Sequence, residues 1–230
     1  MIDIIKESLF FGVAISVGAY ILGGQLKKRF KLFIFNPLLV SITCTIATLL
    51  LAGIDYQSYY NGAKHLSYLL TPATVALAIP LYEQVVYLKK NPTAILAGIT
   101  SGVFASFFSI FALALVFSLD HAQYVTLLPK SITTAIGIGL SQELGGYVAI
   151  TVSAIIVTGL FGNIAGEHLC RVLGITNPIA KGISIGTATH VMGTAKAMEM
   201  GEIEGAMSSL SVAVAGSITV GVAIIFEHLI

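Results

Sequence analysis

Lys130 is the charged residue that most clearly indicates a binding site. It follows Pro129 in a polar stretch between two long apolar runs, and Ser131, Thr133 and Thr134 come after it. A proline interrupts helical hydrogen bonding, so N–H groups where the helix restarts are free to bind an anion. An ammonium group, free N–H groups and hydroxyls together suit a small carboxylate. Alternatively, Lys130 extends toward water and the hydroxyls bond only to the helix backbone.

His190 is the second candidate. A helix that begins near Pro178 would place Thr187, His190 and Thr194 on one face, because residues three and four positions apart lie side by side. Since histidine titrates near neutral pH, His190 could take up a proton together with an anion. Alternatively, it is a neutral packing residue that bonds to a neighbouring carbonyl or hydroxyl group.

The polar stretch has a counterpart earlier in the chain. Residues 70–79 align without gaps on residues 127–136 and match them at leucine, proline, hydroxyl, alanine and isoleucine positions. Two broken segments from a duplicated unit are typical of midplane sites in secondary transporters, which adds Thr74 to the binding candidates. Glu83 and Glu143 follow the two segments, as proton-coupling groups or as helix ends. The alternative for the repeat is a chance match between short apolar strings.

The composition assigns the chain to integral membrane proteins. Hydrophobic residues make up 56% of it and charged residues 10%, against about 25% charged residues in soluble domains. At about 20 to 25 residues for each helical crossing, and with the loops between them, the chain has room for about seven or eight membrane segments. We therefore expect one all-α transmembrane domain over residues 1–230, with broken or re-entrant helices. A net charge of +1 argues against a nucleic-acid partner.

Apolar runs and charges predict the order of the elements. A basic cluster at 27–31 predicts a cytoplasmic first loop and an N-terminus outside the cell. We expect an interfacial loop at 55–64 and an acidic loop that contains Glu199, Glu202 and Glu204; Lys196 is expected to pair with Glu199 or Glu202. The apolar runs are 9–26, 33–52, 66–88, 94–119, 147–169, 178–198 and 206–230.

The segment 124–143 has two interpretations. At about 20 residues it is long enough to cross the membrane. If it crosses, Arg171 and Lys181, which follow the next apolar run, lie outside the cell. If it enters the membrane and returns, these charges lie in the cytoplasm, where positive residues are favoured. The charge rule therefore favours a re-entrant segment.

Several remaining residues are interpreted as packing residues. The Gly162/Gly166 and Gly182/Gly186 pairs let helices approach closely, within the bundle or at a homodimer face. Cys44 and Cys170 lie far apart in apolar runs and do not form a disulfide framework. His190 has no second histidine or cysteine at ligand spacing, so we expect no metal and no cofactor. Hydrolase motifs are absent from the sequence, so we do not expect an enzyme.

The motifs resemble the LrgB/CidB family. The resemblance is carried by residues 36–39, 72–82, 127–135, 142–146, 180–182, 186–199 and 204–209, and it covers essentially the whole chain. It implies a multi-pass protein of the bacterial inner membrane, a holin-like or antiholin-like modulator of murein hydrolases and autolysis that works with a small LrgA/CidA-type membrane protein. Other family members are similar to the plastidal glycolate/glycerate translocator and to bacterial pyruvate uptake systems.

Two functions are therefore expected. The first is transport of small monocarboxylates such as pyruvate or glycolate, together with an LrgA/CidA-type partner and linked to autolysis. The second is a non-transporting, holin/antiholin-like regulator of lysis. A polar midplane favours transport, because a protein that only binds a partner has no need to place Lys130, His190 and many hydroxyls at membrane depth.

Overall fold

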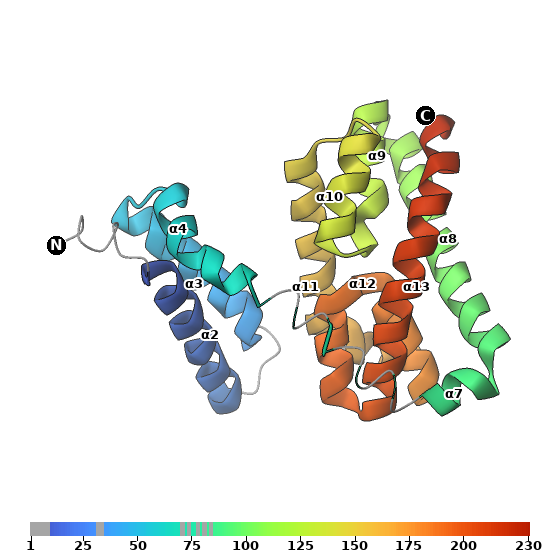
Figure 1. Cartoon of the computed structure of the whole chain (residues 1–230), viewed down its shortest axis with the longest axis horizontal. Coiled ribbons are helices and arrows are strands. Elements are labelled where there is room, and N and C mark those ends of the chain that lie inside the picture. Colours follow the sequence, from blue (N-terminus) through green and yellow to red (C-terminus); the bar gives the residue numbers. More distant parts are fainter. Residues whose placement is uncertain are drawn as a thin grey trace. The chain divides into compact units, whose positions relative to one another are not determined.

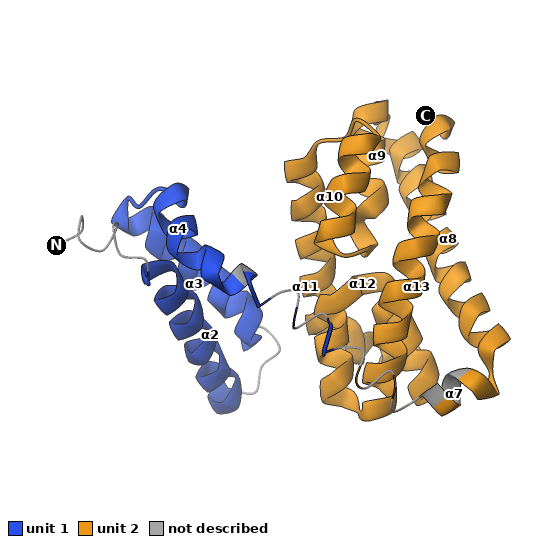
Figure 2. Cartoon of the chain, in the orientation of Figure 1, with its two compact units in different colours: residues 1–76 blue, residues 77–230 orange. Residues whose placement is uncertain are grey.

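The chain is helical in all the elements that this computed structural model describes. The described residues are 10–30, 35–69 and 85–230, with isolated positions at 72, 75, 76, 79 and 82. The chain forms two compact units, residues 1–76 and 77–230 (Figure 2), which are described separately below. The single domain expected over residues 1–230 stays a prediction.

The first unit contains three described helices, α2 (Phe11–Phe30), α3 (Pro37–Ala52) and α4 (Tyr56–Ser67). The loop predicted at 55–64 is wrong, because this segment forms α4. Asp55 caps the helix by accepting a hydrogen bond from Ser58 N at 3.0 Å. The polar composition suggested a loop, but a good N-cap and packing against α2 at Gly12 stabilise a polar helix.

The second unit carries the remaining described helices (Figure 1). Its core forms where one face of α8 packs on α13; the rings of Phe107 and Phe226 lie 4.9 Å apart. Its elements are α7 (Val85–Lys90), α8 (Pro92–Phe117), α9 (His121–Leu127), η2 (Leu128–Ser131), α10 (Thr134–Glu143), α11 (Val148–Val172), α12 (Pro178–Met200), α13 (Glu202–Phe226) and η3 (Glu227–Leu229).

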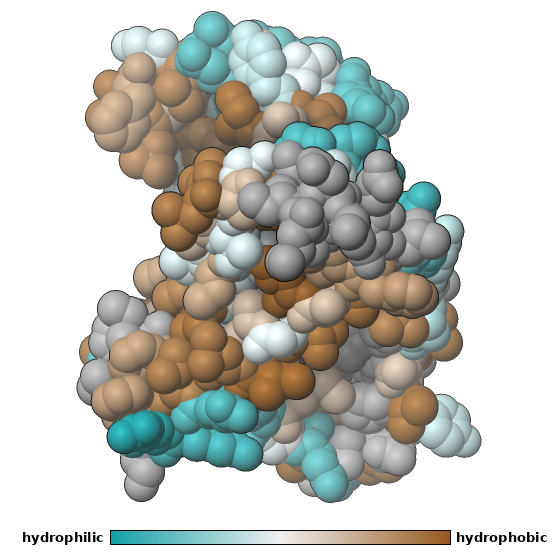
Figure 3. Space-filling model, turned by 90° about the vertical axis from the view of Figure 1, so that its left-hand side faces the viewer, coloured by the Kyte–Doolittle hydropathy of each residue, from teal (hydrophilic) through white to brown (hydrophobic). Residues whose placement is uncertain are grey.

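Three of the described helices are long and apolar enough to cross a membrane, namely α8, α11 and α13. Large apolar side chains on each of them are exposed, for example Phe117 at 69%, Val157 at 66% and Ile225 at 68%. On the side that Figure 3 draws, apolar side chains are exposed beside polar ones. Exposed apolar surface on membrane-length helices is what a lipid environment requires, which confirms the expected all-α membrane protein.

The segment 124–143 forms a hairpin that returns to its starting end (Figure 1). α9 leads into the unit from the end of α8, η2 forms the tip, and α10 leads back to the start of α11. Thr126 in α9 accepts a hydrogen bond from Tyr147 N at 2.8 Å and another from Thr151 Oγ1 at 2.9 Å. Since these bonds join the start of the hairpin to the start of α11, the segment does not cross the unit, as the re-entrant interpretation expects.

A second hairpin is formed by α12, where a single crossing helix was expected over 178–198. Thr189 (φ −137°, ψ 17°) and His190 (φ 46°, ψ −148°) are not helical, and the chain reverses between them. Gly182, before the break, and Gly201, after it, both pack against Glu204. A straight helix would hold these two glycines about 28 Å apart. The sequence has a helical pattern on each side of the break, so it gave no sign of this reversal.

The α12 hairpin enters from the end at which α11 finishes and α13 begins. Gly182 and Gly186 lie against the backbones of Glu204 and Ser208, so the close packing predicted for this glycine pair is confirmed within the unit. The predicted acidic loop is wrong, because Glu199 belongs to α12 and only Gly201 separates it from α13. Acidic side chains in the first turn of α13 are favoured by the helix dipole.

Candidate functional site

The tip of the first hairpin presents Lys130. Pro129 ends the α-helical hydrogen bonding, and Ile132 is extended (φ −108°, ψ 177°) before α10 restarts at Thr134. Lys130 is half-buried, and its Nζ donates a hydrogen bond to Ser131 Oγ at 3.0 Å. It makes no ion pair with any carboxylate in the described part of the chain.

The tip of the second hairpin is held by hydrogen bonds from side chains to the backbone. His190 Nε2 lies 3.0 Å from the carbonyl oxygen of Ile155 in α11, and since a carbonyl only accepts, Nε2 carries the proton. Thr189 Oγ1 donates to Ile185 O at 2.7 Å, and Thr194 Oγ1 donates to His190 O at 3.0 Å. These bonds satisfy carbonyl groups next to the break, which is the condition for a broken helix inside a membrane.

Two glycines of α11 make room for this second tip. A Cβ atom at Gly159 would stand 2.6 Å from Cε1 of His190, and a Cβ at Gly162 would overlap the side chain of Thr189. Any larger residue at these positions would push the tip away from α11. The glycines of α11 therefore position Thr189 and His190.

The two tips meet on either side of one cavity. It has a volume of about 380 Å³, and Lys130 from the first tip and Thr189 from the second both line it. Lys130 is the only charged residue among its described lining residues, and the hydroxyls are those of Thr158, Ser184 and Thr189. The remaining lining residues are Phe161, Gly162, Gly166, Leu169, Cys170, Leu173, Ile175, Ile185 and Ala188.

Of the predicted residues of the first tip, Lys130 lines this cavity, and Ser131, Thr133 and Thr134 are not among its described lining residues. Ser131 accepts the hydrogen bond from Lys130, Thr133 is the N-cap residue of α10, and Thr134 is its first residue. The side chain of Thr133 makes no capping hydrogen bond. Glu143, at the end of α10, is exposed. Thr74, Glu83 and most of the first copy of the proposed repeat, residues 70–79, lie outside the described residues.

The common face expected for Thr187, His190 and Thr194 is wrong, because the chain reverses at Thr189 and His190. Thr187 faces α8, where its methyl group would lie 2.8 Å from a Cβ at Gly102, and its buried hydroxyl has no partner among the described residues. It lines a different groove, between α8 and α12. His190 faces α11, and Thr194 Oγ1 lies 2.8 Å from Ser208 Oγ of α13.

The predicted pairing of Lys196 is confirmed for Glu199, and a second partner was missed. Lys196 Nζ lies 3.4 Å from Glu199 Oε2 and 2.8 Å from Glu167 Oε2 of α11. Thr158 and Thr189 were also missed as cavity residues. Thr158, Gly162 and Gly166 are spaced four residues apart and so lie on one face of a helix, a pattern that could have identified this wall of the cavity.

Comparison with known proteins shows the family of the chain. The model of the LrgB-like family matches residues 16–229. The chain belongs to the LrgB-like family. An antiholin-like protein LrgB of Bacillus subtilis (strain 168) is 40% identical to this LrgB-like chain over 224 residues, 97% of each protein. An antiholin-like protein LrgB of Bacillus cereus (strain B4264) is 40% identical over 212 residues, 92% of each. No solved structure matches the chain. The LrgB-like match includes both hairpins and the whole cavity between them.

Proposed function

We propose that this protein is a membrane carrier, and not an enzyme, for small monocarboxylates of the size of pyruvate or glycolate. The observation that carries the proposal is Lys130, a half-buried cation that lines the cavity and has no carboxylate partner in the described part of the chain. A buried charge is costly unless it is paired, and a bound carboxylate would supply the missing partner.

The other walls of the cavity suit the rest of such a ligand. The hydroxyl of Thr158 can donate to a keto group. The hydroxyls of Ser184 and Thr189, which donate to backbone carbonyls, can accept from a hydroxy group, and Phe161 and Leu169 offer apolar contacts for the carbon atoms. A small monocarboxylate needs one cation, few polar partners and an apolar remainder. A strongly charged ligand would leave its further charges unpaired against these walls.

The two opposed hairpins support a carrier mechanism. The α9–α10 hairpin enters from the end of α8, and the α12 hairpin enters from the opposite end, where α11 finishes. Broken helices whose tips meet near mid-depth are the arrangement that secondary transporters use, because either hairpin can open the site to its own side. His190 lies at the second tip and is our candidate for proton coupling, ahead of the exposed Glu143.

The cellular setting is proposed from the family. We infer a multi-pass protein of the bacterial plasma membrane with its N-terminus outside and with a small LrgA/CidA-type membrane partner. The relatives' name, antiholin-like protein, favours a second candidate function, regulation of murein hydrolase activity during autolysis. Transport and regulation are compatible if the carried carboxylate is the signal.

Uptake of labelled pyruvate and glycolate into proteoliposomes that hold only this protein tests the proposal. Wild type should show saturable uptake, and Lys130→Gln should weaken it about tenfold or more, since a charge-assisted hydrogen bond contributes about 1.5–3 kcal/mol. Lys89→Gln, which changes an exposed lysine of α7, is the matched control and should behave as wild type.

Two outcomes would contradict the proposal. Absence of saturable uptake by wild type would remove the carrier function, and wild-type kinetics in Lys130→Gln would remove Lys130 from the site. The regulator function is tested separately by murein hydrolase activity in cells that carry Lys130→Gln. Normal regulation by a variant that does not transport would show that regulation is independent of the carrier.

A further inference from the structure

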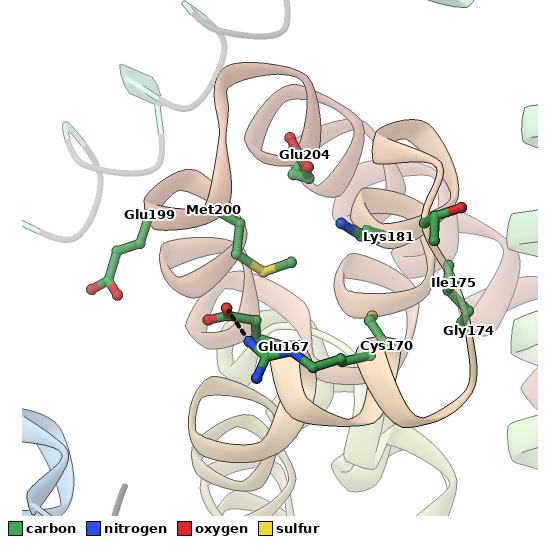
Figure 4. A pocket seen from close by; sticks show the side chains of 10 residues that line it. Glu167, Cys170, Gly174, Ile175, Lys181, Glu199, Met200 and Glu204 are labelled. Carbon is green, nitrogen blue, oxygen red and sulfur yellow. Dashed lines mark hydrogen bonds and ion pairs between the residues drawn. The ribbon is translucent and has the colours of Figure 1, made fainter. Parts of the chain in front are cut away.

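A second cavity of the 77–230 unit, of about 360 Å³, lies at the base of the α12 hairpin (Figure 4). It is bounded by the end of α11, both ends of α12 and the start of α13. We call it the charged pocket, because its lining includes Glu167, Arg171, Lys181, Glu199 and Glu204. Lys130 does not line it, so this pocket is separate from the proposed carboxylate site.

Most of these charges are already paired. Glu167 binds Arg171 at 3.3 Å and Lys196 at 2.8 Å, and Lys196 also lies 3.4 Å from Glu199. Glu204 and Lys181 are different, since neither side chain forms an ion pair or hydrogen bond with the described residues; Lys181 interacts with Glu167 of the pocket only at longer range. The pocket therefore holds one carboxylate and one ammonium group that lack a direct partner among the described residues.

Burial makes the unpaired Glu204 significant. The residue is 9% exposed, and its Oε2 occupies the space that a Cβ at Gly201 would need. Figure 4 shows the Lys181 side chain directed into the pocket, beside the wall on which Glu204 lies. Because this carboxylate lines the pocket and has no cation within ion-pair distance among the described residues, the arrangement favours a ligand that brings one.

We propose that the charged pocket binds a small zwitterion with an ammonium group and a carboxylate, the chemistry of a free α-amino acid. The ligand's ammonium group binds Glu204, and its carboxylate binds Lys181. Together with Lys196, the charged residues of the pocket comprise three acids and three bases, so their net charge is zero. A ligand without net charge leaves this net charge unchanged. Ile175 and Met200 leave an apolar wall for a small side chain.

Isothermal titration calorimetry of the purified full chain in detergent tests this site. Glycine and L-alanine should bind saturably, and each should bind about tenfold or more tightly than acetate or methylammonium, which supply only one charge each. Glu204→Gln and Lys181→Gln should each weaken glycine binding by about tenfold or more. Glu202→Gln changes an exposed acid in the same turn of α13 and should bind as wild type.

Three results would overturn the proposal. They are the absence of saturable amino-acid binding by wild type up to the millimolar range, equal affinity for glycine and acetate, or wild-type binding by Glu204→Gln. Binding of Mg²⁺ or Ca²⁺ that Glu204→Gln abolishes, without amino-acid binding, would assign the pocket to a cation instead. Gel filtration and far-UV circular dichroism check each variant's fold; if Glu204→Gln does not fold, Lys181→Gln decides the question.

Discussion

Gly159→Ala tests whether the reversal of α12 depends on close approach to α11. The added methyl group would stand 2.6 Å from Cε1 and 2.8 Å from Nε2 of His190. The ring must then retreat, and its 3.0 Å hydrogen bond to the carbonyl oxygen of Ile155 is lost. The tip of the second hairpin moves with the ring, because His190 is one of its two non-helical residues.

The free energy of unfolding should fall by about 2 kcal/mol. Overpacking of a buried site costs about 1–3 kcal/mol and the lost hydrogen bond about 1 kcal/mol, while the better helix propensity of alanine offsets about 1 kcal/mol. For a chain of this size, the loss lowers the melting temperature by about 4–8 °C. Gly221→Ala is the matched control, because a Cβ at Gly221 in α13 meets nothing within 4 Å.

Thermal unfolding in detergent, followed by far-UV circular dichroism, measures both variants, since the chain has no tryptophan for fluorescence. Gly159→Ala should melt below wild type, and Gly221→Ala at or slightly above it. If Gly159→Ala melts as high as Gly221→Ala and transports carboxylate normally, the packing of His190 against α11 does not hold the hairpin.

Thr187→Val should leave stability unchanged or raise it by about 1 kcal/mol, because the hydroxyl it removes is buried without a partner, whereas Thr194→Val should lower it by about 1–3 kcal/mol. Equal melting temperatures for the two variants would contradict these assignments. Position 171 is predicted to be cytoplasmic, so a cysteine placed there, after replacement of the native cysteines, should react with an impermeant thiol reagent only in opened cells. Labelling in intact cells would place position 171 outside and contradict the predicted topology. Uptake by wild type should strengthen as the outside pH falls, because the imidazolium of His190 favours an anion, and His190→Gln should flatten this response. Parallel curves would leave His190 as a packing residue.

The first hairpin could be predicted from the sequence. Pro129 cannot continue a helix, and the polar residues around Lys130 cannot face lipid, so a break at this position follows from the residues themselves. The positive charge of Arg171 then favoured a segment that returns to its starting side. The effect of proline on a helix and the preference of positive residues for the cytoplasm both depend on residues that are near in the sequence. The sequence was therefore sufficient to predict this hairpin.

The second hairpin could not be predicted from the sequence, because no residue at its tip forces a break in the helix. Thr189 and His190 are compatible with a helix, and the segment around them has the apolar and small residues of a crossing helix. The reversal depends on Gly159 and Gly162, which lie about 30 residues earlier in the chain and make room for the tip. Long-range packing of this kind leaves no local pattern.

Membrane location, helical class and the break at Pro129 are determined by the sequence itself, since composition and backbone chemistry act without knowledge of distant neighbours. The tertiary structure decided which side chains share a site. It placed Lys130 with Thr158 and Thr189, and it moved Thr187 to a different groove. The physical reason is the reversal of α12, which separates Thr187, before the break, from Thr194, after it, and is set by contacts with α11 and α13.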